Sequence, residues 1–200
     1  SLDQSIFEKQ DDDEIVLCLN YDGLYGINNL NLFLQSSNPN KAIEWGVSKY
    51  KVGDPILFNE SNRFAPLIYN NLKGKILDIE NYGKMIEFTI EVEEVINEMD
   101  TEEYDGLTFV SSSGDKSIIS FFVEEYKGSD EDDNPKSKSN IPFQIAYAVS
   151  IHKSQGLEYN SVKVIITNEI EELISHNIFY TAITRAREKL KIYWYICYGI

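Results

Sequence analysis

The chain has 200 residues with 42% hydrophobic content, enough for one large or two small domains with a buried core. Its formal net charge of −15 argues against broad non-specific binding of nucleic acid, because neutralised phosphates supply most of that affinity. Residues 1–140 carry a net −16 and residues 141–200 a net +1, so any nucleic-acid contact is expected in the last sixty residues.

The chain opens with a predicted strand and helix. Glu14–Asn20 is an apolar run of strand length, and Tyr21–Gly26 is a glycine-containing turn. Ile27–Gln35 has apolar residues on one helical stripe and stops before the breaker pair Asn38-Pro39. These residues predict one β–α unit.

Residues 47–126 have a different character, because short apolar segments alternate with Gly, Asn and Asp turns. This spacing predicts a small antiparallel barrel or sandwich. The segment 118–123 followed by two glutamates imitates a Walker B strand, but we interpret it as a barrel strand. Residues 127–140 are mostly polar and acidic and predict a flexible linker. The predicted strands are Pro55–Phe58, Lys75–Ile79, Met85–Val92, Leu107–Ser111 and Ser117–Val123.

The helix and strand alternation resumes after the linker. Ile145–Val149 and Val162–Thr167 are predicted as buried strands, Ile174–Glu188 as a helix and Leu190–Cys197 as a final strand. Long apolar runs suit parallel strands that are covered on both faces. The sequence therefore predicts an α/β domain made of residues 1–46 and 141–200, interrupted by the all-β insertion 47–126.

The cysteine, histidine and apolar content argues against a metal-binding protein and against a membrane-spanning one. The two cysteines and two histidines have no metal-site spacing, so we expect reduced thiols in a cytoplasmic protein and no metal site. No apolar run approaches the roughly 18 residues of a membrane span, so no membrane partner is expected. The chain starts at a serine within a polar, acidic stretch, and we interpret it as a fragment of a longer protein.

The first motif is AYAVSIHKSQGLEY, residues 146–159. A predicted strand ends in hydroxyl, imidazole, ammonium and amide groups, which are expected beyond its carboxyl end, where open α/β sheets bind ligands. Ser150, His152 and Lys153 could donate to phosphate oxygens, Gly156 admits a close backbone approach, and Glu158 could accept from a ribose hydroxyl. The alternative is an ordinary loop with a solvated lysine, which the full run HKSQG makes less attractive.

The second motif is FYTAITRAREKL, residues 179–190. On the predicted helix, Arg185 and Arg187 lie just outside the two edges of the apolar arc. An arginine at such an edge suits the terminal phosphate of a nucleotide in a cleft. The alternative is a solvated Arg185 paired with Glu188, worth only tenths of a kcal/mol.

The order of the two motifs, separated by an apolar strand, resembles the second motor domain of UvrD/RecD-type superfamily 1 helicases, a RecA-like parallel-sheet lobe. Residues 21–39 resemble the motif IV region of the RecD branch. Residues 53–78 resemble the start of its inserted SH3-like barrel. Where that motif IV offers a basic residue near the nucleotide, this chain has Asp22, Tyr21 and Tyr25, so it departs from the family there, although a tyrosine could stack on adenine.

The resemblance implies a role for each motif residue. Arg185 would be the arginine finger on the γ-phosphate of ATP, and Gln155, Gly156 and Glu158 would line the nucleotide, with Gln155 coupling its state to domain closure. Ser150, His152 and Lys153 would contact the backbone of single-stranded DNA. The barrel would help to hold the strand, with Tyr69 or Phe64 stacking on a base.

The chain is therefore expected to be the C-terminal portion of an ATP-dependent DNA helicase of the DNA repair type. ATP and Mg²⁺ would be bound by the intact parent, whose N-terminal RecA-like domain is the expected partner together with single-stranded DNA. This chain has no G-x-x-x-x-G-K-[ST] phosphate loop, so alone it is expected to hold no cofactor and to be inactive. The alternative is a non-catalytic regulatory module whose acidic barrel docks a protein.

Overall fold

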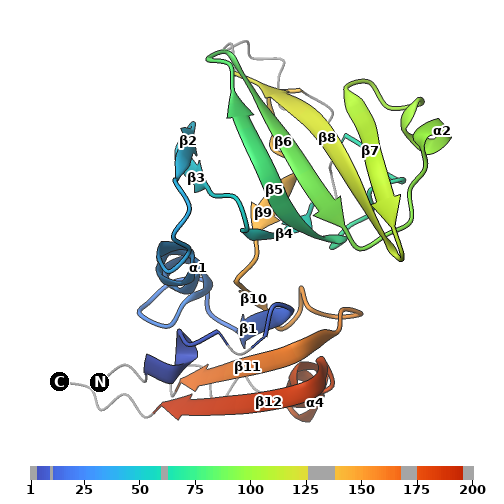
Figure 1. Ribbon diagram of the computed structural model, residues 1–200. Coiled ribbons are helices and arrows are strands. Elements are labelled where there is room, and N and C mark those ends of the chain that lie inside the picture. The colour runs from blue at the N-terminus through green and yellow to red at the C-terminus, as the bar shows by residue number, and fades with distance from the viewer. Residues whose placement is uncertain (1–3, 10, 60–62, 126–137, 168–174, 196–200) are drawn as a thin grey trace. The chain divides into compact units, whose positions relative to one another are not determined.

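The computed structural model describes the chain except residues 1–3, 10, 60–62, 126–137, 168–174 and 196–200 (Figure 1). It forms two compact units, one made of residues 1–37 and 146–200 and the other of residues 38–145. Residues 38–46 and 141–145, which the sequence placed in the α/β domain, thus fall in the second unit. Most of the predicted linker lies outside the described residues.

The first unit is built on a four-stranded parallel sheet in the order β10-β1-β11-β12. The sheet confirms the predicted parallel α/β architecture. Its centre is apolar, and β11 is buried along almost its whole length, as expected for a strand covered on both faces. The strands are β1 (Glu14–Cys18), β10 (Ala148–Ser150), β11 (Tyr159–Thr167) and β12 (Ala186–Tyr195).

Helix α1 (Ile27–Ser36) covers one face of this sheet and confirms the predicted helix. Its Ile27 and Leu30 pack with residues of the sheet and with Ile6 of the 3-10 helix η1 (Gln4–Ile6). The side-chain amide of Asn31 makes two hydrogen bonds to Ala148 of the outermost strand β10. Its Oδ1 accepts from the Ala148 amide at 2.9 Å, and its Nδ2 donates to the Ala148 carbonyl at 2.8 Å.

A buried ion pair ties the N-terminal segment to the sheet. The Lys163 side chain on β11 is 1% exposed, and its Nζ lies 2.7 Å from Oε1 of Glu14 on β1. The same Nζ donates to the carbonyls of Ile6 at 3.0 Å and Glu8 at 2.6 Å. The second Glu14 oxygen accepts from Ser161 at 2.8 Å. The ammonium therefore has three acceptors, which a buried charge requires.

The predicted helix over residues 174–188 is wrong in its second half. Helix α4 (His176–Ile183) begins after the N-cap Ser175, whose side chain accepts from the Ile178 amide, and ends at the C-cap Thr184. From Ala186 the chain is strand β12 and pairs in parallel with β11. Backbone pairing with the sheet thus outweighs the helical propensity of the TRAREKL run.

The predicted strand over residues 145–149 is also wrong, because two strands of different sheets share it. Strand β9 (Phe143–Ile145) pairs antiparallel with β4 in the second unit, whereas β10 pairs in parallel with β1. Ala146 and Tyr147 separate the two strands and mark the boundary between the units. A continuous apolar run did not reveal this change of sheet.

The second unit contains a six-stranded antiparallel sheet in the order β7-β8-β6-β5-β4-β9. Five of its strands contain the predicted ones, with ends that differ by at most two residues, and residues 118–123 lie on strand β8 as predicted. A small hairpin and a one-turn helix complete the unit. Its elements before β9 are β2 (Ile43–Trp45), β3 (Ser48–Tyr50), β4 (Pro55–Phe58), β5 (Lys73–Asn81), β6 (Met85–Val92), α2 (Glu98–Thr101), β7 (Leu107–Ser113) and β8 (Lys116–Glu124).

Packed aromatic rings form the centre of this unit. Phe88 is fully buried and meets Phe143 edge-on, with ring centroids 5.1 Å apart, and Phe58 and Phe121 pack in the same cluster. Strands β7 and β9 are the two ends of the sheet order, and no pairing of described residues joins them. Closure into an SH3-like barrel therefore stays a prediction.

No helix among the described residues is long and apolar enough to cross a membrane.

Candidate functional site

The first motif forms a tight turn directly after β10. The Ile151 amide extends the pairing with β1 by donating to the Cys18 carbonyl at 3.1 Å. The Ser150 hydroxyl is nearly buried and accepts from the Lys153 amide at 3.1 Å, while the Ser154 hydroxyl donates to the Ile151 carbonyl at 2.7 Å. Both serines therefore shape the turn, in the manner of local caps.

Two long polar side chains of this turn, those of His152 and Gln155, are exposed, and Lys153 is half-buried. Burial lowers the pKa of Lys153, because desolvation disfavours its charged form. A phosphate beside this ammonium would offset part of that desolvation. The exposure of these groups leaves an imidazole and an ammonium accessible at the turn, and their contact with phosphate stays a prediction.

The rest of the motif returns to the opposite end of the sheet. The sequence predicted the whole group 150–158 beyond the carboxyl ends of the strands, and this is wrong for its second half. Ser150 ends β10, but Glu158 immediately precedes β11 and so lies at the amino edge. Because β10 and β11 both run parallel to β1, the connection must run back to the start of β11. Gly156 occurs in it with a φ of +84°, a conformation that favours glycine.

Arg185 lies in the turn between α4 and β12 rather than on a helix. Its Nε donates to the Thr181 carbonyl at 2.9 Å, its Nη1 to the Leu157 carbonyl at 3.0 Å and its Nη2 to the Thr184 hydroxyl at 3.0 Å. Its own carbonyl accepts from the Tyr159 amide at 2.8 Å. Arg185 thus joins the second motif to the end of the first, and the alternative pairing with Glu188 is not found among these contacts.

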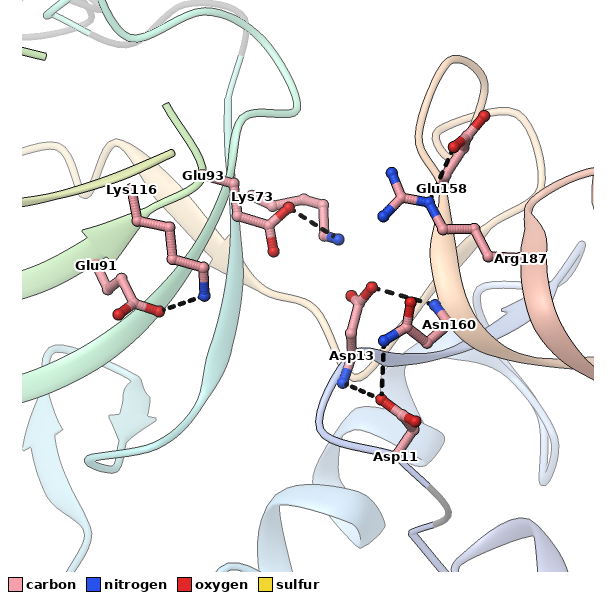
Figure 2. Close-up of polar contacts among 9 residues, drawn as sticks. All are labelled: Asp11, Asp13, Lys73, Glu91, Glu93, Lys116, Glu158, Asn160 and Arg187. Carbon is pink, nitrogen blue, oxygen red and sulfur yellow. Dashed lines mark hydrogen bonds and ion pairs between the residues drawn. The ribbon is translucent and has the colours of Figure 1, made fainter. Parts of the chain in front are cut away.

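The two arginines of the second motif differ in how their charges are compensated. The three hydrogen-bond acceptors of Arg185 are two carbonyls and a hydroxyl, all neutral, and they use three of its five N–H groups. Arg187 instead pairs with Glu158, with Nε 2.9 Å from Oε2, and both side chains are 57% exposed (Figure 2). Arg185 therefore retains N–H groups and positive charge for an anion, whereas Glu158 already holds a cation.

A second polar group at the amino edge was not predicted (Figure 2). The Asn160 amide donates to Asp13 Oδ2 at 3.1 Å, and its side chain donates to Asp11 Oδ1 at 3.3 Å. The Asp13 amide also donates to Asp11 Oδ1, at 3.0 Å, and this bond is the main cause of the lowered pKa of Asp11. Lys189 Nζ lies 3.7 Å from the other Asp11 oxygen. The sequence shows that the N-terminal run is acidic, but it does not show where these carboxylates lie in the fold.

The region that resembles motif IV follows β1, at the carboxyl edge. Tyr21 is 58% exposed, and Asp22 accepts from the Asn28 side chain at 3.1 Å. Since Arg185 and Glu158 lie at the amino edge of the same sheet, the structure does not bring this region together with them.

The proposed stacking residues of the second unit have different exposures. Phe64 is 1% exposed and packs in the core with Phe121, so the prediction that it stacks on a base is wrong. Tyr69 is 45% exposed, and its hydroxyl donates to Glu94 at 3.2 Å. Only Tyr69 of this pair presents a ring to solvent.

Residues 145–193 match the family model of the UvrD-like helicase C-terminal domain. This stretch includes both motifs and all the residues predicted to contact the nucleotide or the DNA backbone. Residues 145–193 are a superfamily 1 helicase C-terminal region. The resemblance inferred from the two motifs is thereby confirmed.

Relatives among characterised proteins extend the likeness of this helicase region to most of the chain. The RecBCD enzyme subunit RecD of Buchnera aphidicola is 25% identical over 193 residues, which cover 89% of this chain and 24% of that subunit. The RecD subunit of Mycolicibacterium smegmatis is 39% identical over 46 residues, 23% of this chain and 8% of the subunit. The chain thus spans about a quarter of the length of the first of these relatives.

Among solved structures, Bacteroides Pif1 bound to single-stranded DNA has a TM-score of 0.47 and 14% sequence identity. The match covers 92% of this chain and 41% of that one.

Proposed function

We propose that this chain is the C-terminal portion of an ATP-dependent DNA helicase and supplies its arginine finger. Arg185 would contact the γ-phosphate of ATP, and Gln155, Gly156 and Glu158 would line the nucleotide. The observation that carries the proposal is the Arg185 guanidinium, which three neutral acceptors hold at the amino edge of the sheet beside residues 157–159.

A fixed but uncompensated guanidinium suits the stabilisation of charge on a transferred phosphoryl group. A side chain already held in place needs little reorganisation when that charge develops. The planar fork of arginine can keep its hydrogen bonds to the protein and still offer N–H groups to phosphate. These properties favour Arg185 over Arg187, whose charge is paired.

The remaining parts of the ATP site would come from the parent protein. Its N-terminal RecA-like domain would supply the phosphate loop, the Mg²⁺ ligands and the residue that positions water. ATP and Mg²⁺ would then be held between that domain and this one. Gln155 is exposed on the connection that leads to Glu158, which suits a role in reporting the nucleotide state to the DNA track.

Single-stranded DNA would run past the turn at the carboxyl end of β10. His152 and Lys153 are the proposed donors to its backbone, and Ser150 would act mainly by holding the Lys153 backbone. The second unit would be an SH3-like barrel that guides the strand, with Tyr69 as its candidate stacking residue. DNA repair is the proposed process.

The central test is Arg185→Ala in the full-length parent. We expect DNA-stimulated ATP hydrolysis to fall by about 10³- to 10⁵-fold, the usual effect of removing an arginine finger. Binding of a fluorescent ATP analogue should stay close to wild type. Wild-type turnover in this variant would overturn the assignment.

The matched control is Arg187→Ala, which removes a paired arginine two residues away. Its hydrolysis should remain far above that of Arg185→Ala, and equal losses in the two variants would contradict the distinction between the arginines. An Arg185→Lys variant tests the planar fork, because lysine keeps the charge but not the geometry. We expect it to recover only a small part of the activity.

A further inference from the structure

The second unit has an exposed aromatic face where the β5–β6 hairpin meets strand β8. Tyr82 is 55% exposed in the hairpin turn, Met85 is 40% exposed at the start of β6, and Phe122 is 37% exposed on β8 between the buried Phe121 and Val123. The Tyr82 and Phe122 rings lie 6.2 Å apart. We call these three residues, together with the carboxylates of Glu80, Glu87 and Glu124, the Tyr82 patch.

Strand register places the acidic side chains of the patch against its apolar ones. Glu80 on β5 is opposite Glu87 on β6, and Glu87 is opposite Phe122 on β8, so the three form one row across adjacent strands. Glu124 is opposite Met85 in the next row on that side. Like charges directly opposite each other destabilise a sheet. Neither Glu80 nor Glu87 has an ion-pair partner within the described parts of the chain.

The hydrogen bond and the raised pKa of Tyr82 reflect the negative electrostatic potential of this face. Its hydroxyl donates to Glu80 Oε2 at 2.6 Å. That hydrogen bond, with smaller contributions from burial and from the charges of Glu80 and Glu87, raises the pKa of Tyr82 to about 12. The surrounding unit is also acidic, since residues 38–145 contain 21 Asp+Glu and 11 Lys+Arg.

Two described cations border the patch. Lys84 is exposed in the hairpin turn between Tyr82 and Met85, and its amide donates to the Tyr82 carbonyl at 3.1 Å. Arg63 packs its guanidinium over the buried Phe64 ring, 4.7 Å from the centroid, and donates to the Phe122 carbonyl. Arg63 thus contacts the backbone of Phe122, and the Glu124 carboxylate also acts on its charge. Neither Arg63 nor Lys84 forms an ion pair with Glu80 or Glu87 among the described contacts.

We infer that the Tyr82 patch docks an arginine-bearing segment of a protein partner. The guanidinium would lie between the Glu80 and Glu87 carboxylates and stack on the Phe122 and Tyr82 rings, while a neighbouring apolar side chain covers Met85. Arginine suits such a site because its planar cation both stacks on aromatic faces and pairs with carboxylates. The carboxylates repel phosphates, so this face disfavours nucleic acid. The inference does not depend on the helicase assignment.

A binding experiment with the 200-residue chain tests the inference. The probe is a short fluorescein-labelled peptide of alternating arginine and leucine, followed by anisotropy. We expect Tyr82→Ser and Phe122→Ser each to weaken binding about two- to fivefold, the contribution of one exposed cation–π contact. The double variant Glu80→Gln, Glu87→Gln should weaken binding further and should reduce its dependence on salt.

Matched controls separate this site from general charge attraction. Tyr180→Ser removes an aromatic ring that is 67% exposed in the other unit, and it should leave the affinity for the peptide unchanged. Unchanged binding in Tyr82→Ser and in the double glutamate variant would overturn the inference. It would also be overturned if a labelled oligothymidine bound the chain and lost affinity in these same variants. Because Tyr82 lies in a hairpin turn and is exposed, its variant tests the site even if Phe122→Ser impairs folding.

Discussion

The guanidinium of Arg185 donates to the carbonyl of Leu157 at 3.0 Å, and the amide of Tyr159 donates back to the Arg185 carbonyl at 2.8 Å. These two bonds join the middle of the second motif to the end of the first, at the amino ends of the neighbouring strands β12 and β11. A nucleotide contact at Arg185 would therefore act directly on residues 157–159. The structure thus links the two motifs through both the side chain and the backbone of Arg185, and the exposed Arg187–Glu158 pair adds a further link.

The two arginines should differ in their contributions to folding. Arg185→Ala removes three partly buried hydrogen bonds, so we expect a loss of about 1–3 kcal/mol in the free energy of unfolding. Arg187→Ala removes one exposed ion pair and should cost about 0–1 kcal/mol. Urea unfolding of the two variants measures both losses. An equal loss would contradict the contacts described for Arg185.

Lys163 should be a major determinant of stability in the first unit. Lys163→Met leaves the Glu14 carboxylate and the Ile6 and Glu8 carbonyls without their buried cation, and we expect a loss of about 3–5 kcal/mol. Adding Glu14→Leu should recover part of that loss, since it removes the unpaired charge. Lys189→Met, at the exposed pair with Asp11, is the control and should cost about 0–1 kcal/mol. Chemical denaturation measures all three, and a small effect of Lys163→Met would contradict the burial of this pair.

We expect Asp11 to contribute to a fall in the free energy of unfolding at acidic pH. Its folded pKa is lowered, chiefly by the hydrogen bond from the Asp13 amide, with contributions from Asn160 and Lys189. The contribution of the ionised Asp11 to the free energy of unfolding is therefore complete above its unfolded pKa of about 3.9. It is lost as the pH falls through the lower folded pKa. In unfolding curves measured across the acid range, Asp11→Asn should flatten part of that decline. Asp12→Asn is the control, and an identical change in both variants would count against a specific role for Asp11.

Lys153 should govern the affinity of the chain for single-stranded DNA. The Lys153 side chain is half-buried in the turn that Ser150 holds, and Lys153→Ala would remove its proposed contact with one DNA phosphate. We expect weaker binding and a salt slope smaller by about 0.7, the value for one phosphate on a single strand. Titration of labelled oligothymidine at several salt concentrations measures both. Lys9→Ala, in the exposed Lys9–Asp12 pair, should change neither, and binding that ignores Lys153 would favour a protein-docking role.

The sequence predicted most of the second unit because its strands are short, alternating and separated by turn residues. Phe88 and its alternate neighbours on β6 are buried while the residues between them are not, which is the period that strands require. In the first unit, helix α1 was predicted from the apolar stripe of Ile27–Gln35, and strand β11 from the continuous apolar run Val162–Thr167. The parallel order of the sheet followed from apolar runs without alternation.

The predictions from the sequence were wrong or incomplete where pairing between distant segments determines the backbone conformation. Ala186 and Leu190 fit the apolar arc of a helix, yet both belong to a strand that pairs with β11. The cluster around Asp11 depends on contacts with Asn160, almost 150 residues away, and no local pattern predicts it. Lys163 could have been noticed, since a lone lysine inside the apolar run SVKVIIT requires a buried partner.

The paired hydrogen bonds between Asn31 and Ala148 have a consequence for self-association. An outermost strand usually offers free backbone groups to which another polypeptide can add a strand. The carboxamide of Asn31 occupies both outward-facing groups of Ala148, as the backbone of a further strand would. Helix α1 thus blocks the edge of β10 at Ala148, and another polypeptide cannot add a strand to the sheet through the backbone groups of that residue.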